Sequence, residues 1–194
     1  GWWWSRKDGS YPTSKFEAVD GNWFYFDDNG YMYANQWLHH TDGNWYWFDK
    51  DGDMANSGWK KISGIWYYFN SSGVMQTGWQ QLSGTWYYFN SAGAMETGWQ
   101  QISNVWYYFD NNGYMQTGWK YLSGSWYYLN SSGGMVTGWQ TIGNNRYLFS
   151  SSGTLQTGWQ QSGGVWYYFD SNGYLQTGWK QISGVSVSYT HLTL

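Results

Sequence analysis

The stretch GWKKISGIWYYFNSSGVMQT, residues 58–77, is one copy of a unit that recurs along the chain. Its opening glycine–tryptophan pair returns every 20 residues, with tryptophans at Trp59, Trp79, Trp99, Trp119, Trp139, Trp159 and Trp179. A second tryptophan follows seven residues later in most copies, at Trp66, Trp86, Trp106, Trp126 and Trp166. A fixed period of this length is typical of repeat architectures, in which each copy is one small structural unit.

The first third of the chain carries the same unit with looser spacing. The runs WFYF (residues 23–26) and WYWF (residues 45–48) are two further copies, and residues 2–4, with Gly9 at the turn, form a degenerate first one. One later copy begins with Arg146 in place of tryptophan. The count predicts about nine units, which together make one repeat domain over residues 1–185.

Each unit is predicted to be a β-hairpin. The run WYYF (residues 66–69) favours a strand because it is aromatic. The next residues, NSSG (70–73), favour a turn, since glycine accepts a positive φ and Asn or Ser bonds its own backbone. Residues 74–77 would then be the return strand, and Gly78-Trp79 would begin the link to the next hairpin. Because a lone hairpin is barely stable in water, the expected fold is an all-β solenoid of stacked hairpin repeats.

Composition excludes several classes of function. Aromatic residues make up 25% of the chain and charged residues only 11%, so the core must be built mainly from rings. No basic run is present, which argues against a nucleic-acid partner, and no apolar stretch reaches membrane-spanning length. Carboxylates lie mostly in turns and no Gly-x-Ser-x-Gly motif occurs. We therefore expect no catalytic residues and no cofactor.

Two segments have the composition of metal sites. Residues 49–53 (DKDGD) resemble a calcium loop, but the glycine comes too early for an EF-hand and the segment occupies the turn position of the repeat. His39 and His40 are neighbours on an extended segment, so their side chains face apart. We expect no metal site at either segment.

The paired tryptophans are the candidate binding residues. Alternation along the strand places Trp66 and Tyr68 on one face and Tyr67 and Phe69 on the other, and we expect Tyr67, Phe69 and their equivalents to be core. Tryptophan is seldom fully buried, and two per unit exceed what a thin core needs. Two indoles from one unit and a tyrosine from the next could therefore line a notch at each hairpin junction.

Such a notch suits one kind of ligand. Three ring faces with no nearby acid would attract a quaternary ammonium group, because each face adds cation–π attraction and the methyl groups remain in apolar contact. One notch would bind weakly, but several on one rod would bind a polymer of such groups with avidity. Methionines such as Met75 and Met95 could flank the notches or serve only as packing.

The unit GWKKISGIWYYFN (residues 58–70) resembles the choline-binding, or cell-wall-binding, repeat, and the resemblance covers residues 1–185. DGSYP (8–12), KFE (15–17) and HTDGNWYWFD (40–49) resemble the start of the choline-binding domain of autolysins of the N-acetylmuramoyl-L-alanine amidase type. The family implies a left-handed solenoid that binds choline on teichoic and lipoteichoic acids. It further implies that the module is part of a parent protein, such as a murein hydrolase, which has a separate catalytic or effector domain. Whether that parent forms a homodimer is left open. The implied location is the bacterial cell wall or surface. The parent would be a bacterial protein or a phage-encoded lysin that acts there.

The family also implies which residues form the sites. They are the linker tryptophan, the strand-opening tryptophan and the third aromatic residue of the following hairpin. By position these are Trp37, Trp45 and Tyr68; Trp59, Trp66 and Tyr88; Trp79, Trp86 and Tyr108; and Trp99, Trp106 and Tyr128. Weaker sites are expected at Phe16, Trp23 and Trp47, where Phe replaces the linker tryptophan, and at Trp119 and Trp126.

The chain departs from the family pattern in one copy. Leu148 replaces the tyrosine that would complete the notch of Trp119 and Trp126, so that notch is expected to lack its third wall. Arg146 would bring a guanidinium into the notch of Trp139, which we expect to leave no room for another cation. Trp159 and Trp166 lack a following tyrosine altogether.

The last residues break the repeat. Residues 186–194 (SVSYTHLTL) stand where another aromatic strand is due, and residues 187–194 resemble the translation of a sequencing adapter. We expect 186–194 to be a non-native tail, with a divergent terminal unit as the alternative.

Two other functions remain open. Carbohydrate-binding repeats, such as those of glucan-binding domains, share the Tyr-Tyr-Phe runs and turn glycines, but they carry the paired tryptophans less regularly. A purely structural spacer would bind no saturable ligand. A choline titration distinguishes these three hypotheses.

Overall fold

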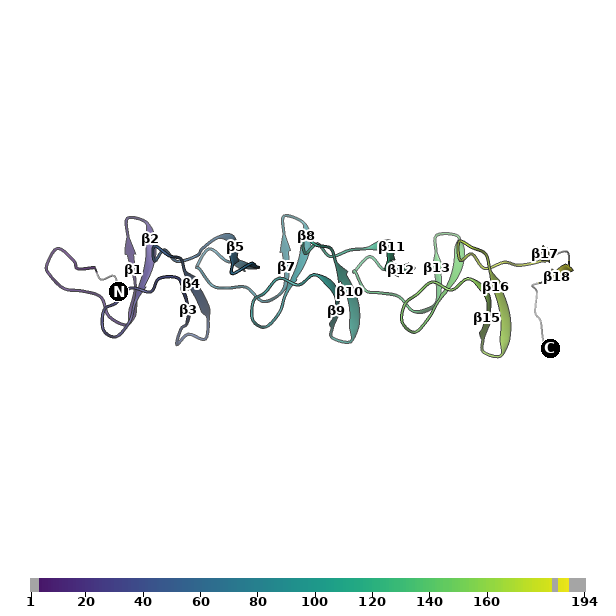
Figure 1. Cartoon of the computed structure of the whole chain (residues 1–194), viewed down its shortest axis with the longest axis horizontal. Coiled ribbons are helices and arrows are strands. Elements are labelled where there is room, and N and C mark those ends of the chain that lie inside the picture. Colours follow the sequence, from purple (N-terminus) through teal and green to yellow (C-terminus); the bar gives the residue numbers. More distant parts are fainter. Residues whose placement is uncertain (1–3, 183–184, 189–194) are drawn as a thin grey trace. The chain divides into compact units, whose positions relative to one another are not determined.

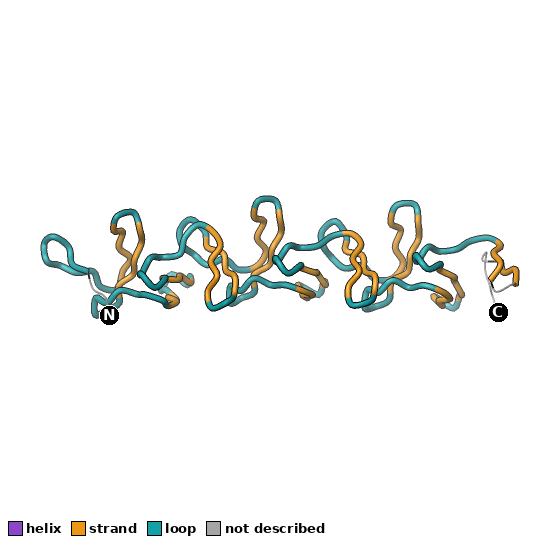
Figure 2. Tube along the Cα trace, turned by 45° about the horizontal axis from the view of Figure 1, so that its top comes forward, coloured by secondary structure: helices purple, strands orange, loops and turns teal. Residues whose placement is uncertain are grey.

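The computed structural model describes residues 4–182 and 185–188, which form nine two-stranded antiparallel sheets and no helix (Figure 1). The strands are β1 Lys15–Val19, β2 Asn22–Phe26, β3 Gln36–His39, β4 Trp45–Phe48, β5 Gly58–Ile62, β6 Ile65–Phe69, β7 Gly78–Leu82, β8 Thr85–Phe89, β9 Gly98–Ile102, β10 Val105–Phe109, β11 Gly118–Leu122, β12 Ser125–Leu129, β13 Gly138–Ile142, β14 Asn145–Phe149, β15 Gly158–Ser162, β16 Val165–Phe169, β17 Trp179–Ile182 and β18 Val185–Ser188. Each hairpin is followed by a loop that leads to the next (Figure 2). The all-β fold of successive hairpin repeats is therefore confirmed.

The chain divides into two compact units, Gly1–Glu96 and Thr97–Leu194. The left-handed coiling that the resemblance implies stays a prediction. Most of the predicted non-native tail, residues 189–194, lies outside the described residues, and β18 covers Val185–Ser188. No helix among the described residues is long and apolar enough to cross a membrane.

The pairing inside each hairpin differs from the prediction. β6 pairs with β5, which contains the supposed linker residue Trp59, and not with a return strand over residues 74–77. The connection is the two-residue turn Ser63-Gly64, where φ is positive at both residues (49° and 87°). This is the turn type whose twist matches that of the flanking strands, so it closes a regular hairpin. We therefore refer to Trp59 and its equivalents as first-strand tryptophans, and to Trp66 and its equivalents as second-strand tryptophans.

The predicted turn at residues 70–73 exists but has another role. The Asn70 side-chain oxygen accepts hydrogen bonds from the Ser72 and Val74 amides, both at 3.0 Å. The chain then forms only a single bridge, between Phe69 and Met75, before it moves on to the next hairpin. This turn therefore reverses the chain at the end of each unit without building a strand pair.

Within each compact unit the end-of-unit turns stack on one another. A β-carbon at Gly73 would overlap the Met54 side chain of the preceding turn, and the same relation joins Gly173 to Leu155. The amide of Met54 donates a hydrogen bond to the Trp23 carbonyl at 2.8 Å, which ties each turn to the preceding hairpin. From β2 to β16, the last residue of each second strand is fully buried: Phe26, Phe48, Phe69, Phe89, Phe109, Leu129, Phe149 and Phe169. The prediction that the phenylalanine position is core is confirmed.

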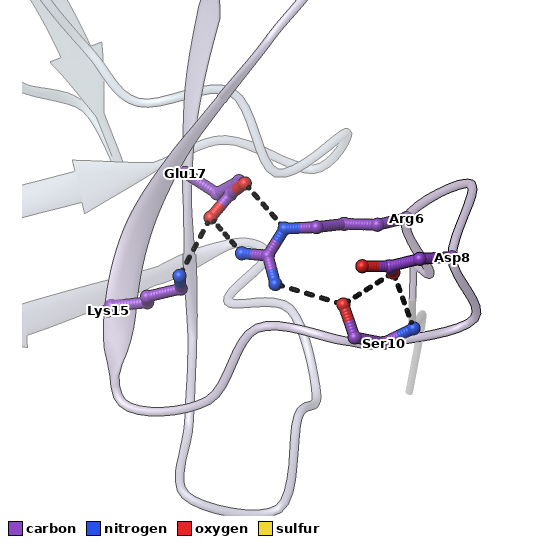
Figure 3. A network of polar contacts seen from close by, with 5 residues as sticks. All are labelled: Arg6, Asp8, Ser10, Lys15 and Glu17. Atoms are coloured by element: carbon purple, nitrogen blue, oxygen red, sulfur yellow. Dashed lines mark hydrogen bonds and ion pairs between the residues drawn. The ribbon is translucent and has the colours of Figure 1, made fainter.

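A polar network fixes the strand that carries Phe16 (Figure 3). The Arg6 guanidinium donates to both Glu17 carboxylate oxygens, at 3.1 and 2.7 Å, and Lys15 Nζ lies 3.3 Å from the same carboxylate. The hydrogen bond from Arg6 is the main cause of a lowered Glu17 pKa. Arg6 also donates to Ser10 at 3.3 Å, so the loop before β1 is tied to that strand.

Candidate functional site

Strand register decides which rings share a face. Trp59 is paired with Tyr68 across β5–β6, and Trp66 with Lys61, so both tryptophans and Tyr68 lie on one face of the hairpin. The Trp59 and Trp66 rings are 6.2 Å apart and nearly perpendicular, at 86°. The Tyr68 ring packs against Trp59 at 5.4 Å. The third aromatic residue thus supports the first-strand tryptophan of its own hairpin.

The opposite face of the next hairpin closes the junction. Tyr87 and Phe89 of β8 lie 4.8 and 5.5 Å from the Trp59 ring. Tyr88, the predicted third wall, instead packs against Trp79 of its own hairpin at 5.2 Å. The structure therefore brings the second aromatic residue of the following hairpin to the tryptophan pair, and not the third.

The same arrangement recurs at the other predicted sites. Trp37 and Trp45 lie 6.4 Å apart, and the ring that approaches Trp37 is Tyr67, at 4.9 Å. Trp99 and Trp106 lie 6.5 Å apart, with Tyr127 at 5.0 Å from Trp99, whereas Tyr128 packs against Trp119. Trp79 and Trp86 lie 6.1 Å apart in the first compact unit. Tyr108 belongs to the second compact unit and packs against Trp99.

One cavity lies at the weaker predicted site of Phe16 and Trp23. It has a volume of about 480 Å³ and is lined by Phe16, Trp23, Tyr46, Met54, Ser71 and Ser72. The wall from the next hairpin is Tyr46, 4.9 Å from Phe16, whereas the predicted Trp47 packs across its own hairpin against Trp37 at 5.2 Å. We call this the first cavity.

Tyr46 is held in place by a carboxylate behind it. Its hydroxyl donates to the Asp42 carboxylate at 2.7 Å, and Asp42 also accepts from the Asn44 amide at 2.8 Å. Burial and this hydrogen bond raise the pKa of Tyr46 to about 12, and the amide of Asn44 with the Tyr46 hydroxyl lowers the pKa of Asp42 to about 2. At neutral pH the wall is thus a neutral phenol anchored to an ionised acid.

The second cavity lies at Trp119 and Trp126, whose rings are 6.3 Å apart at 83°. It has a volume of about 360 Å³ and is lined by Trp119, Trp126, Tyr147, Leu155, Ser171, Asn172 and Tyr174. The expectation that this notch lacks its third wall because of Leu148 is wrong. Tyr147, which is buried and lies 4.9 Å from Trp119, supplies that wall.

Both cavities can accept a cation without an opposing charge. The residues that line them carry no acidic or basic side chain, and besides the rings they include serine and asparagine side chains of the end-of-unit turns. The second-strand tryptophans at the two cavities, Trp23 and Trp126, are 44% and 46% exposed, so their ring faces are open to a ligand. Open indole faces attract a methylated ammonium through cation–π interaction.

The junction of Trp139 is different. The Arg146 guanidinium carbon lies 4.7 Å from the centre of the Trp139 ring, which confirms that a cation of the protein itself occupies this notch. The Trp139 indole nitrogen donates to the Ser162 hydroxyl at 3.0 Å. Tyr167 supplies the usual wall at 4.8 Å. That this junction binds no external cation stays a prediction.

The sequence pattern did not reveal the residues that lie opposite the second-strand tryptophans. Lys61 Nζ lies 5.6 Å from the Trp66 ring, and the His39 ring stacks on Trp45 at 4.6 Å. Each is the cross-strand partner of its tryptophan. Only knowledge of the hairpin register could have revealed this position, because it lies five or six residues before the tryptophan in sequence.

Comparison with known proteins agrees with this geometry. The Choline-binding repeat model matches residues 13–59, 56–96 and 96–137, and the cell wall binding repeat model matches residues 137–155 and 157–175. A lysin of Pneumococcus phage Dp-1 is 56% identical over 46 residues, which are 23% of this chain and 16% of the lysin.

Two solved structures from Streptococcus pneumoniae are similar over most of the chain. CbpJ of strain TIGR4 is 40% identical with a TM-score of 0.80, over 89% of this chain and 62% of CbpJ. Choline binding protein F, solved in the presence of a peptidoglycan analogue, is 41% identical with a TM-score of 0.78, over 89% of this chain and 61% of that protein. The chain thus spans less than two thirds of each of these relatives. It belongs to the choline-binding repeat family, whose cell-wall-binding repeats form a non-catalytic module.

Proposed function

We propose that the junctions between successive hairpins bind choline, each through two perpendicular indoles of one hairpin and the second aromatic residue of the next. The observation that supports this most directly is the pair of cavities at Phe16–Trp23 and Trp119–Trp126, both lined by rings and free of charged lining residues. A trimethylammonium group is apolar on its surface and positive overall, so such a cavity satisfies both of its properties.

The proposal extends to the junctions with the same ring geometry. Within the two compact units their tryptophan pairs are Trp37–Trp45, Trp59–Trp66 and Trp99–Trp106. In this proposal Tyr67, Tyr87 and Tyr127 take the place that the family resemblance assigned to Tyr68, Tyr88 and Tyr128. Tyr68, Tyr88 and Tyr128 instead pack against the first-strand tryptophans of their own hairpins.

The biological ligand that we infer is choline on teichoic and lipoteichoic acids at a bacterial surface. Each cavity is small and open, so a single choline should bind with an affinity on the order of millimolar. Several sites on one chain that meet a polymer with many choline groups would raise the overall affinity by orders of magnitude. The module would thus anchor its parent protein, which we propose to be a murein hydrolase of the amidase type or a phage lysin. Only the reading frame adjoining this module can identify that parent.

A titration with choline, followed by tryptophan fluorescence and near-ultraviolet circular dichroism, tests the proposal. We expect saturation with choline and no response to dextran. Saturation with dextran instead would favour a carbohydrate-binding module, and no saturable response to either would favour a spacer.

Equilibrium dialysis with labelled choline assigns the sites. Trp23→Ala and Trp126→Ala should each remove about one bound choline per chain, because each loses one wall and, with it, roughly tenfold or more in affinity. Tyr31→Ala is the matched control, since Tyr31 is 51% exposed and lines neither cavity. Unchanged choline uptake in both tryptophan variants would contradict the assignment.

A further inference from the structure

The second cavity is built from three consecutive hairpin units. Trp119 and Trp126 come from β11 and β12, and Tyr147 comes from β14. Ser171, Asn172 and Tyr174 come from the turn after β16, one unit further along. The first cavity has the same plan, with Ser71 and Ser72 contributed by the turn after β6. The third unit therefore belongs to the cavity and can vary from one cavity to the other.

One position in that third unit differs between the two cavities. Tyr174 precedes Leu175, the residue that bridges to Phe169, and Val74 precedes Met75, which bridges to Phe69 in the same way. Tyr174 lines the second cavity, whereas Val74 does not line the first and instead packs against the core cluster that contains Tyr46 and Met54. The second cavity thus has an additional ring at a position where the first has an aliphatic side chain.

The Tyr174 ring is held close to the other walls. It lies 5.5 Å from the Tyr147 ring at an angle of 65°, and Tyr147 in turn lies 4.9 Å from Trp119. Burial raises the pKa of Tyr147, and the neighbouring Tyr174 raises it further. With Trp126 on the other side of Trp119, four rings surround the cavity.

Two hydrogen bonds, from the amides of Tyr174 and Leu175, hold the backbone at Tyr174 in place. The Tyr174 amide donates to the Asp170 carboxylate at 3.0 Å, and the Leu175 amide donates to the Arg146 carbonyl at 3.0 Å. The ring is 37% exposed, so part of its surface remains available to a ligand. Tyr174 is therefore presented to the cavity by an ordered turn.

We propose that Tyr174 is a fourth aromatic wall that makes the second cavity the tighter of the two for a quaternary ammonium ion. This inference rests on the proposed choline-binding function. An additional phenol face within contact distance of the cation adds cation–π attraction that Val74 cannot supply in the first cavity. Removal of that ring should weaken choline binding at the second cavity by roughly threefold to tenfold.

Fluorine NMR of the chain labelled with 5-fluorotryptophan can measure choline binding at each cavity separately. The Trp23 and Trp126 signals, assigned by single Trp→Phe substitutions, report the choline concentration at half-saturation of the first and second cavities. We expect the Trp126 signal to saturate at the lower concentration. Tyr174→Val should raise its midpoint by roughly threefold to tenfold and leave that of Trp23 unchanged.

Two further variants distinguish the contribution of the Tyr174 ring face from that of its hydroxyl group. Tyr174→Phe should keep the Trp126 midpoint within about twofold, because the ring remains. Tyr31→Val is the matched control, since Tyr31 occupies the same turn position in the first unit, is 51% exposed and lines neither cavity. If Tyr174→Phe weakens binding as much as Tyr174→Val, the hydroxyl and not the ring face is responsible, and the proposal is overturned.

A neutral isostere of choline tests the role of charge. 3,3-Dimethylbutan-1-ol has the shape of choline without its positive charge, so Tyr174→Val should weaken its binding much less than that of choline. An equal loss for both ligands, or an unchanged Trp126 midpoint with choline, would overturn the proposal. If none of the tryptophan signals responds to choline even before substitution, the proposed function itself fails instead.

Discussion

The first and second cavities have the same backbone frame but different rings. In both, a first-strand aromatic residue, a second-strand tryptophan and a tyrosine of the next hairpin meet beside a methionine or leucine of an end-of-unit turn. The first cavity has Phe16 where the second has Trp119. The comparison shows that the same hairpin register and turn stacking can present different rings to a cavity without a change of fold.

The two cavities also differ in what holds their tyrosine walls. Tyr46 in the first donates to the Asp42 carboxylate, whereas Tyr147 in the second packs against the Tyr174 ring. Asp42, which holds Tyr46, does not line the first cavity, whereas Tyr174, which packs against Tyr147, does line the second. The tyrosine wall can therefore be held in two ways, and only contact with Tyr174 adds a ring to the lining.

The largest effects are expected at the glycines behind the cavities. Gly73→Ala and Gly173→Ala would each force a side chain onto a positive φ of 78° and into Met54 or Leu155, which line the first and second cavities. We expect a loss of about 2–4 kcal/mol in unfolding free energy, larger for Gly173 because leucine adapts less than methionine. Urea unfolding without choline measures this loss.

Gly84→Ala is the matched control for both glycines. Its φ is also positive, at 83°, but nothing lies within 4 Å of an added β-carbon. It should therefore cost only the backbone strain, about 1 kcal/mol. Equal losses at Gly84 and Gly173 would show that turn stacking contributes nothing to stability.

Giving each cavity the first-strand ring of the other should reduce the difference in choline affinity between the two cavities. Phe16→Trp should lower the choline concentration at half-saturation of the first cavity by roughly threefold, because indole is the better cation–π partner. Trp119→Phe should raise that of the second cavity by a similar factor. The fluorine signals of Trp23 and Trp126 measure both changes. If neither midpoint moves while both variants remain folded, the first-strand ring does not contact the ligand.

The smallest effect is expected from pH at the first cavity. The Asp42 pKa of about 2 lies below its ordinary 3.8, so the Tyr46–Asp42 bond contributes its full stability above about pH 4 and loses it as pH falls toward 2. The Tyr46 pKa of about 12 lies above 10, so its contribution is complete below pH 10 and is lost as pH rises through 12. The Tyr46–Asp42 bond itself should therefore cause no change in choline binding reported by Trp23 between about pH 5 and pH 9. A midpoint within that range that persists in His40→Gln would mean that a group other than this pair and its neighbour His40, whose Nδ1 lies 3.3 Å from Asp42, controls this wall.

The repeat, the all-β class and the buried phenylalanines could be predicted from the sequence, but the hairpin partner could not. Asn70–Gly73 has the stronger turn composition because it combines asparagine, serine and glycine. The Ser63-Gly64 turn is short and inconspicuous, yet its two positive φ values suit a two-residue hairpin. Asp20-Gly21 and Gly163-Gly164, at the same position in other units, were the clearer signals.

The third wall was assigned wrongly for a related reason. Alternation correctly places Tyr87 and Tyr88 on opposite faces of their hairpin, but it does not say which face meets the preceding hairpin. The structure turns the Tyr87 face toward Trp59, so a residue expected to be core is also a wall. The prediction that the Arg146 guanidinium would lie in the notch of Trp139 was correct. Arg146 takes the place of a second-strand tryptophan, and that position had already been assigned to the notch.

The hydrogen bonds from the turn amides to the tryptophan carbonyls have a thermodynamic consequence. Leu155 donates to the carbonyl of Trp126, so the backbone beneath a ligand-contacting indole is shared between neighbouring hairpins. A molecule bound in such a cavity holds three hairpins together and is released when any of them melts. Occupancy at ten times the dissociation constant adds about 1.4 kcal/mol per site. The melting temperature should therefore climb with choline concentration, and the chain should be most resistant to proteases while attached to its polymer.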